Sequence, residues 1–322
     1  MAVYTKLSEK NLKEFLKKYD KGQLLNYKGI QEGIENTNYY IETEKGKFIL
    51  TVYEKRVDEK DLPFFMSVMK NLYDSKFPSP QPIINKNGNY ITEILNKKAA
   101  MVSFLEGKAK KILSPDDCKK VGIHTAKLHL ITKNLISKRQ NKLSVNSWKK
   151  IYSKIKNDCS KIHPNLSKIV EKNLNEMESK WPKDIPSGII HADLFSDNIF
   201  FKNNELTGII DFYFSCNDYY AFEIAICLNA LCFEGIKENL SFNVTKAKKF
   251  IDGYSAVRQL KDKEKKCLKI LCQGAAMRFL LTRVFDYLNL TKGALVKIKD
   301  PVEYLKRLEF HNSIKNYQDY FF

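Results

Sequence analysis

The sequence predicts an α+β protein with two lobes: a small β-rich N-terminal lobe with one long helix, and a larger, mostly helical C-terminal lobe. Three observations predict this fold class. Strand-like runs fill much of residues 23–54, helical periods dominate after residue 114, and the stretch 188–214 interrupts them with short apolar runs. A chain of 322 residues with 43% hydrophobic residues can fill a core in each lobe.

The N-terminal lobe is expected to begin with an amphipathic helix, because apolar residues follow the cap residue Ser8 at helical spacing. A second, longer helix is expected with Pro63 in its first turn. Runs of apolar and β-branched residues bounded by turns predict antiparallel strands at 23–30, 38–43, 47–54, 82–84 and 90–94. The lobe is therefore a small sheet accompanied by helices.

The C-terminal lobe is expected to open with a helix at Pro115, behind the cap residue Ser114. Helical spacing predicts further helices at 146–160, 164–180, 219–233, 244–258, 262–290 and 301–312. The predicted domain organisation is an N-terminal lobe at 1–102, a hinge at 103–107 (SFLEG) and a C-terminal lobe at 108–322.

Composition excludes several classes of protein. The net charge is +18, but only six of the 55 basic residues are Arg and the Lys residues are dispersed, so nucleic acid is not an expected partner. Seven cysteines without a CxxC pair indicate neither a disulfide framework nor a zinc site, which favours a reduced, cytoplasmic setting. No signal peptide or membrane span is expected, and the sequence leaves the oligomeric state open.

Side chains that can act in catalysis or bind a metal are densest in HADLFSDN at 191–198. An isolated acid follows at Asp211. The segment between Asn198 and Asp211 reads as a hairpin, which returns these two residues to the same end. A carboxylate and an amide carbonyl that converge in this way are suited to Mg²⁺. Asp193, in the preceding loop, is left free to face the group that receives a phosphate.

The pattern H-x-D-x-x-x-x-N with a later strand-end Asp is the arrangement of a kinase catalytic loop. In this arrangement Asp193 is the base, and Asn198 and Asp211 bind the metal. His191 is expected to brace the loop by hydrogen bonds. Each residue alone would fit a polar turn or a strand end. The joint spacing favours phosphoryl transfer.

A nucleotide should then be covered by the N-terminal lobe. The turn before residue 38 contains Gly33, followed by side chains and N–H groups that can meet phosphate. The strand at 47–54 has Thr51 where a phosphate-pairing Lys is expected, and Lys55 lies further along on the same face. The residues assigned to the nucleotide are Gly33, Asn36, Thr37, Asn38, Thr51, Ser103 and Leu105.

The chain resembles the homoserine kinase family of the aminoglycoside-phosphotransferase and choline-kinase-like superfamily. The resemblance runs over essentially the whole chain and is carried by segments such as YKGIQEGIENTNYYIET, GIIHADLFSDNIFF and LTGIIDFYFSCNDYYAFEIAICLNALCFE. It implies a bilobal protein-kinase-like fold, ATP and Mg²⁺ as cofactors, and phosphorylation of the side-chain hydroxyl of L-homoserine in threonine biosynthesis.

Two positions depart from the family's pattern. Ser196 stands where the loop usually has Pro, and Glu223 stands where the following helix usually has Asp. In kinase-like folds the later acid accepts hydrogen bonds from the catalytic loop, so the resemblance implies that Glu223 is a second brace. Thr51 is not a departure, because similar family members also have Thr in this strand.

An amino-acid acceptor requires a cation for its carboxylate and an oxygen-rich group for its ammonium. The candidates are Asn217, Asp218, Arg278 and Arg283. Arg283 could instead pair with Asp286, and Arg278 could instead brace the loop. Alternative functions are another small-molecule hydroxyl kinase, of the choline or aminoglycoside type, and a non-catalytic nucleotide-binding protein.

Overall fold

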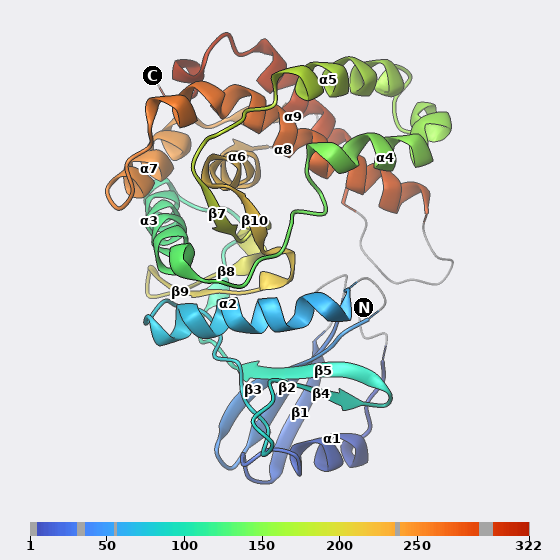
Figure 1. Ribbon diagram of the computed structural model, residues 1–322, viewed down its shortest axis with the longest axis vertical. Helices are drawn as coiled ribbons and strands as arrows, with labels where there is room; N and C mark the ends of the chain where they lie inside the picture. Colours follow the sequence, from blue (N-terminus) through green and yellow to red (C-terminus); the bar gives the residue numbers. More distant parts are fainter. Residues whose placement is uncertain (1–4, 31–35, 55–56, 236–238, 290–298, 322) are drawn as a thin grey trace.

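The computed structural model describes residues 5–30, 36–54, 57–235, 239–289 and 299–321. Its N-terminal part contains α1 (Glu9–Leu16), β1 (Leu24–Ile30), β2 (Thr37–Thr43), β3 (Gly46–Val52), α2 (Leu62–Asp74), β4 (Ile91–Ile94) and β5 (Lys97–Ser103). The five strands form one antiparallel sheet in the order β1-β2-β3-β5-β4. This sheet, followed by a mostly helical part, confirms the α+β fold class (Figure 1).

The C-terminal part contains seven helices among the described residues: α3 (Pro115–Ile131), α4 (Val145–Ile155), α5 (Leu166–Lys180), α6 (Tyr220–Leu231), α7 (Val244–Ser255), α8 (Asp262–Leu288) and α9 (Val302–Ser313). Its strands are β6 (Lys108–Ala109), β7 (Ser187–Ile190), β8 (Ile199–Lys202), β9 (Glu205–Ile209), β10 (Cys216–Tyr219), β11 (Phe233–Glu234) and β12 (Ser241–Phe242). The helices lie where the sequence predicts them. Within the described part of the chain, no helix is both long and apolar enough to cross a membrane.

Two predicted strand features differ from the structure. Residues 82–84 do not form a strand. Pro82 makes only an isolated bridge to Val102. The strand that lies between β3 and β4 is β5, which the sequence did not predict. Its sequence KKAAMVS lacks the alternation expected of a half-buried strand, because four consecutive residues, 99–102, are buried.

The buried apolar residues form two clusters. One core lies between α1 and the sheet and includes Leu12, Ile41 and Leu50. The other contains the apolar side of α2, with Phe65 and Leu72, and continues without interruption into the C-terminal helices. Helix α2 thus lies between the sheet and the C-terminal part, as Figure 1 shows.

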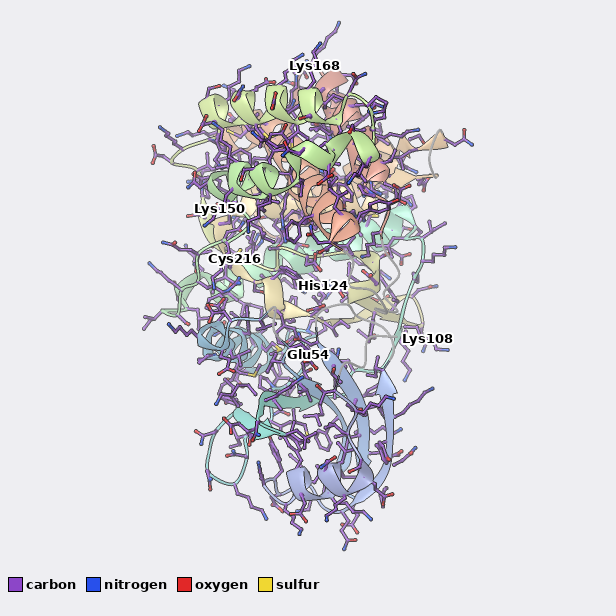
Figure 2. All side chains as sticks on the ribbon, turned by 90° about the vertical axis from the view of Figure 1, so that its right-hand side faces the viewer. Glu54, Lys108, His124, Lys150, Lys168 and Cys216 are labelled. Carbon is purple, nitrogen blue, oxygen red and sulfur yellow. The ribbon has the colours of Figure 1, made fainter. Side chains whose placement is uncertain are left out.

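The segment predicted as a hinge, 103–107, joins β5 to β6. A second link between the two parts is the hydrogen bond that the Ile209 N–H donates to the Pro78 carbonyl, at 2.8 Å. The action of 103–107 as a hinge, and the lobe boundaries beside it, stay predictions. Lys108, Lys150 and Lys168 lie on three different elements in Figure 2, as expected for dispersed positive charge.

Candidate active site

The hairpin predicted between Asn198 and Asp211 is confirmed. Strands β8 and β9 pair with Ile199 opposite Ile209, and the Ile210 N–H donates to the Asn198 carbonyl at 3.0 Å. Asn198 ends a single 3-10 turn, η4 (Ser196–Asn198), and Asp211 precedes another, η5 (Phe212–Phe214). Both residues therefore stand at the same end of the hairpin. Asp211 is exposed and Asn198 is buried.

The side chain of Asn198 connects this hairpin to Asp193. Its Nδ2 donates to the Asp193 carbonyl at 2.9 Å and to the Asp193 carboxylate at 3.3 Å. The amide oxygen Oδ1 is thereby left as the atom that can face a cation. Together with the Asp211 carboxylate it gives two hard oxygen donors, a set that fits Mg²⁺. No three His, Cys, Asp or Glu residues of the described chain gather into a metal site, so the remaining ligands of a cation would be water and phosphate.

His191 is fully buried and holds the loop at two points. Its Nδ1 accepts the Asp193 N–H at 3.2 Å, and its Nε2 lies 2.8 Å from the Ile210 carbonyl. These partners assign the proton of the neutral ring to Nε2. Burial lowers the pKa of His191 to about 4, so the ring stays neutral near pH 7. The geometry is that of a structural connection between the catalytic loop and the end of the hairpin.

Ala192 has a left-handed backbone, with φ of 65°, between His191 and Asp193. The buried Glu223 carboxylate accepts the N–H groups of His191 and Ala192, the latter at 3.1 and 3.2 Å. The Ala192 carbonyl accepts from Arg278 Nη1 at 2.6 Å. Helices α6 and α8 therefore hold opposite sides of this one residue. A strained conformation of this kind persists only where its surroundings fix it.

Burial and one guanidinium set the charges of this region. Burial raises the pKa of the Asp193 carboxyl to about 6, although the neighbouring Arg278 and Lys299 pull it down. Burial likewise raises the pKa of Glu223 to about 7, against the N–H groups of the loop and Arg278, which lower it. Asp193 can thus exchange a proton near neutral pH, as a general base must.

Four of the residues assigned to the nucleotide bond to other groups of the N-terminal part. The Glu54 N–H donates to Asn36 Oδ1 at 3.2 Å, and the Thr37 hydroxyl donates to the Glu54 carboxylate at 2.8 Å. The Thr51 hydroxyl donates to Asn38 Oδ1 at 2.8 Å. These contacts order the strands beside the predicted nucleotide. Their role toward a nucleotide stays a prediction.

The other assigned residues lie at the hinge or outside the described residues. Ser103 Oγ accepts the Gln81 N–H at 2.9 Å, and Leu105 lies over Gly208 of β9. Gly33 and Lys55 lie outside the described residues.

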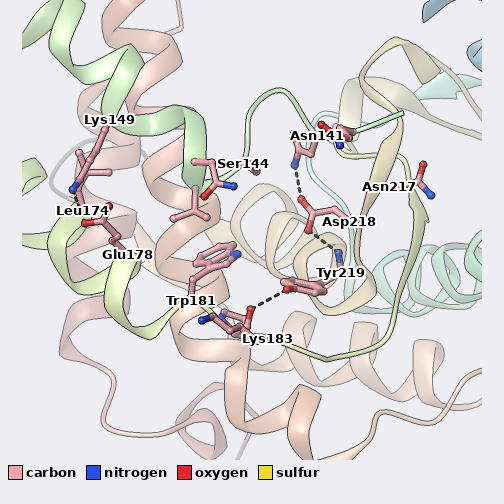
Figure 3. Close-up of a pocket in the computed structure, with 14 residues that line it drawn as sticks. Asn141, Ser144, Lys149, Leu174, Glu178, Trp181, Lys183, Asn217, Asp218 and Tyr219 are labelled. Atoms are coloured by element: carbon pink, nitrogen blue, oxygen red, sulfur yellow. Dashed lines mark hydrogen bonds and ion pairs between the residues drawn. The ribbon is translucent and has the colours of Figure 1, made fainter. Parts of the chain in front are cut away.

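A polar cavity of about 590 Å³ lies beside β10, α4 and α5 (Figure 3). Asp218 lines it, accepting from Asn141 Nδ2 at 2.6 Å and from the Tyr219 N–H at 2.7 Å. Burial raises the pKa of the Asp218 carboxyl. Asn217 also lines the cavity, but its Oδ1 accepts the Arg139 N–H at 2.9 Å. Asp218 therefore places a mostly buried carboxyl group beside space that a small molecule can enter.

The two arginines proposed as substrate ligands are engaged elsewhere. Arg278 is 2% exposed and bonds the Ala192 carbonyl, which is the loop-bracing alternative left open by the sequence. Arg283 donates to the Asp300 carbonyl at 3.0 Å and to the Glu303 carboxylate at 2.9 Å. Five residues along α8 turn the side chain by roughly 140° away from that of Arg278. The helix thus directs Arg278 and Arg283 to different faces.

Sequence reasoning missed three polar residues near this site. Lys299 lies 3.5 Å from Asp197 of the catalytic loop and over the ring of Phe195. Asn141 holds Asp218, and Arg139 contacts the segment that follows Asp211. None belongs to a motif, and each meets its partner only through the fold. An isolated basic or amide residue in a polar segment carries no local sign of such a contact.

The sequence matches the phosphotransferase enzyme family over residues 26–259, which is more than half of the chain. The fold is shared with solved structures of this kind. An amicoumacin kinase in complex with AMP-PNP and Ca²⁺ matches with a TM-score of 0.71 at 14% identity, over 96% of this chain and 94% of that one. A spectinomycin phosphotransferase in complex with ADP matches with a TM-score of 0.67 at 15% identity, over 98% of each chain. The fold and the hairpin site thus define a phosphotransferase of the kinase-like class.

Relatives with curated functions are closer in sequence. The chain is 44% identical to the homoserine kinase of Allorhizobium ampelinum over 320 residues, which cover 99% of each protein. It is 46% identical to the homoserine kinase of Rhodopseudomonas palustris over 321 residues, 99% of this chain and 97% of that protein. The chain therefore belongs to the homoserine kinase family.

Proposed function

We propose that the chain transfers the γ-phosphate of ATP to the side-chain hydroxyl of L-homoserine, giving O-phospho-L-homoserine for threonine biosynthesis. The observation that carries the proposal is the joint placement of Asp193, Asn198 and Asp211 at one end of the hairpin, in a member of the homoserine kinase family. Seven free cysteines fit a reduced cytoplasmic setting.

In the proposed reaction, the Asp193 carboxylate accepts the proton of the acceptor hydroxyl. The hydroxyl oxygen forms a bond to the γ-phosphorus as the bond to the bridging β,γ-oxygen breaks, and ADP leaves with that electron pair. His191 and Glu223 do not exchange protons in this scheme. They fix the backbone on either side of Ala192, so that the Asp193 carboxylate is already in place when the acceptor binds.

Asn198 and Asp211 would hold Mg²⁺ through Oδ1 and the carboxylate. A bound cation would supply positive charge to offset the charge on the transferring phosphate. Two protein ligands suit a cation that keeps water and substrate oxygens in most of its shell. The hydrogen bonds from Asn198 Nδ2 to Asp193 also fix the orientation of the amide, so its oxygen cannot exchange places with its nitrogen without losing them.

For the acceptor, Asp218 is the side chain that we assign to the ammonium group. It is an anion at the wall of the polar cavity, held at a fixed angle by Asn141 (Figure 3). An ammonium group bound there would offset the burial that raises the pKa of Asp218. The charge of Arg278 favours the ionised form of Asp218, but no described residue forms an ion pair with it, so a cationic group should bind there in preference to a neutral one.

The proposed substrate is tested by an ADP-release assay in which L-homoserine, threonine, serine, choline and kanamycin are compared side by side. We expect turnover with L-homoserine to exceed turnover with every other acceptor, because the family match extends over the whole chain. A reaction without acceptor gives the background of ATP hydrolysis. Turnover confined to choline or kanamycin would rule out the homoserine assignment.

The proposed base is tested by Asp193→Asn. This change removes the proton acceptor but keeps the size of the side chain, so we expect kcat to fall by about 100-fold to 10,000-fold. ADP binding, measured by calorimetry, should stay within about twofold of the original protein because the loop keeps its other bonds. A variant with unchanged kcat would remove Asp193 from the role of base.

The proposed ammonium contact is tested by Asp218→Asn. We expect KM for L-homoserine to rise by about 10-fold to 100-fold, because a charged hydrogen bond is lost, while KM for ATP stays the same. Glu178→Gln is the matched control, since Glu178 lines the same cavity but is exposed and pairs with Lys149. Equal changes in KM in both variants would show that Asp218 has no specific contact with the acceptor.

A further inference from the structure

Arg139 is a largely covered cation in the segment between α3 and α4, away from every motif of the family. Its Nε donates to the Asp61 carboxylate at 2.6 Å, and its Nη1 donates to the carbonyls of Ser215 at 3.0 Å and Phe214 at 3.4 Å. Its guanidinium lies over the ring of Phe65 at 5.0 Å. The side chains of Arg139 and Asp61 are 13% and 15% exposed, so water weakens this pair little.

These partners belong to parts of the chain that the reaction must bring together. Asp61 directly precedes α2 at its N-cap position, and Phe65 is the fourth residue of the helix. Phe214 and Ser215 end the short turn that begins directly after Asp211. One planar side chain therefore connects the helix that supports the N-terminal sheet with the loop that carries the proposed metal ligand.

The backbone of Arg139 extends this connection to the acceptor side. Its N–H donates to Asn217 Oδ1 at 2.9 Å, and its carbonyl accepts the Asn217 N–H at 2.7 Å. Asn217 is directly followed by Asp218 on β10. The segment around Arg139 is thus fastened to β10 by its backbone and to the Asp211 loop and α2 by its side chain.

We propose that Arg139 is a positioning residue that fixes the loop after Asp211 against α2 and so sets the place of the metal-binding carboxylate. The inference rests on the proposed function, because it takes Asp211 as a ligand of the metal. The guanidinium meets these partners with two different nitrogens, Nε and Nη1, which are held in one fixed plane. A Lys ammonium is a single charged atom on a flexible stem, so we expect it to hold the same partners less rigidly.

The chain offers a matched control in Lys142, which binds the same carboxylate. Its Nζ lies 2.9 Å from Asp61 and 3.0 Å from Asp58, and its side chain is 53% exposed. Lys142 shares Asp61 with Arg139, but within the described part of the chain it forms no hydrogen bond with the carbonyls that follow Asp211. It also remains beside Asp61 when Arg139 is replaced, so that carboxylate keeps a positive neighbour.

The test compares Arg139→Met, Arg139→Lys and Lys142→Met in the full-length protein. The first readout is the affinity for ADP with and without Mg²⁺, measured by calorimetry, because it needs no acceptor. Mg²⁺ increases the affinity of the original protein for ADP by some factor. We expect this factor to be at least fivefold smaller in Arg139→Met, while the affinity for ADP without metal stays unchanged. Lys142→Met should keep that gain within twofold.

The second readout is the Mg²⁺ concentration that gives half of the maximal rate with L-homoserine. We expect it to rise at least fivefold in Arg139→Met and to rise less in Arg139→Lys. If Arg139→Met does not fold, Arg139→Lys decides the matter, since it keeps a positive charge beside Asp61. A normal Mg²⁺ requirement in Arg139→Lys and a normal ADP gain in Arg139→Met would each overturn the inference, as would an equal loss in Lys142→Met.

These outcomes separate the inference from the proposed function. An original protein that binds ADP no better with Mg²⁺ than without it contradicts the proposed metal site itself. An original protein with a normal Mg²⁺ effect but no turnover of L-homoserine contradicts only the substrate assignment. In that second case the first readout still decides the role of Arg139.

Discussion

Ala192 adopts a left-handed backbone directly before the residue proposed as the base. For a residue other than glycine this conformation costs roughly 1–2 kcal/mol. The cost is offset because Glu223 accepts the Ala192 N–H and Arg278 donates to its carbonyl. Both partners come from helices that pack against each other in the core. The turn is therefore held in place by α6 and α8. The direction of the Asp193 side chain follows from that turn.

The charges around this turn depend on one another. Two carboxyl groups with raised pKa, Asp193 and Glu223, lie near a single buried guanidinium. Arg278 favours the charged form of both, which burial opposes. His191 adds no charge near pH 7 because burial lowers its pKa and keeps the ring neutral. It acts only by hydrogen bonds. Among the groups that hold the turn at Ala192, the titrating charges are therefore those of Asp193 and Glu223, and His191 adds none.

The hairpin of the candidate site could be predicted from the sequence because its pattern is local, and the roles of the residues on it stay predictions. The spacing from His191 to Asn198 and the hairpin to Asp211 are patterns within 21 residues, and the resemblance supplied Glu223. The sequence did not predict β5, because its buried run shows no alternation of buried and exposed residues. It also did not decide between the two roles of Arg278. Arg139 could not be found at all, since its partner Asp61 lies 78 residues away and only the packing of α2 brings them together.

The packing of α2 could not be predicted from the sequence. The change from strands to helices is visible in the sequence, but α2 shares its apolar core with the C-terminal helices and not with the sheet face that α1 covers. Hydrophobic spacing shows that α2 has an apolar face, without showing which partner covers it. This packing puts α2 against the turn after Asp211, where Phe65 and Tyr213 meet edge to face at 5.6 Å.

The central claim is that Glu223 acts by holding the strained turn at Ala192. It is tested most directly by measuring kcat for Glu223→Ala with Ala192 present and with Ala192→Gly. Glycine adopts the left-handed conformation without strain, so we expect Glu223→Ala to lower kcat by about 10-fold to 100-fold beside alanine and clearly less beside glycine. An equal loss in both backgrounds would contradict the claim, because the two residues would then act independently.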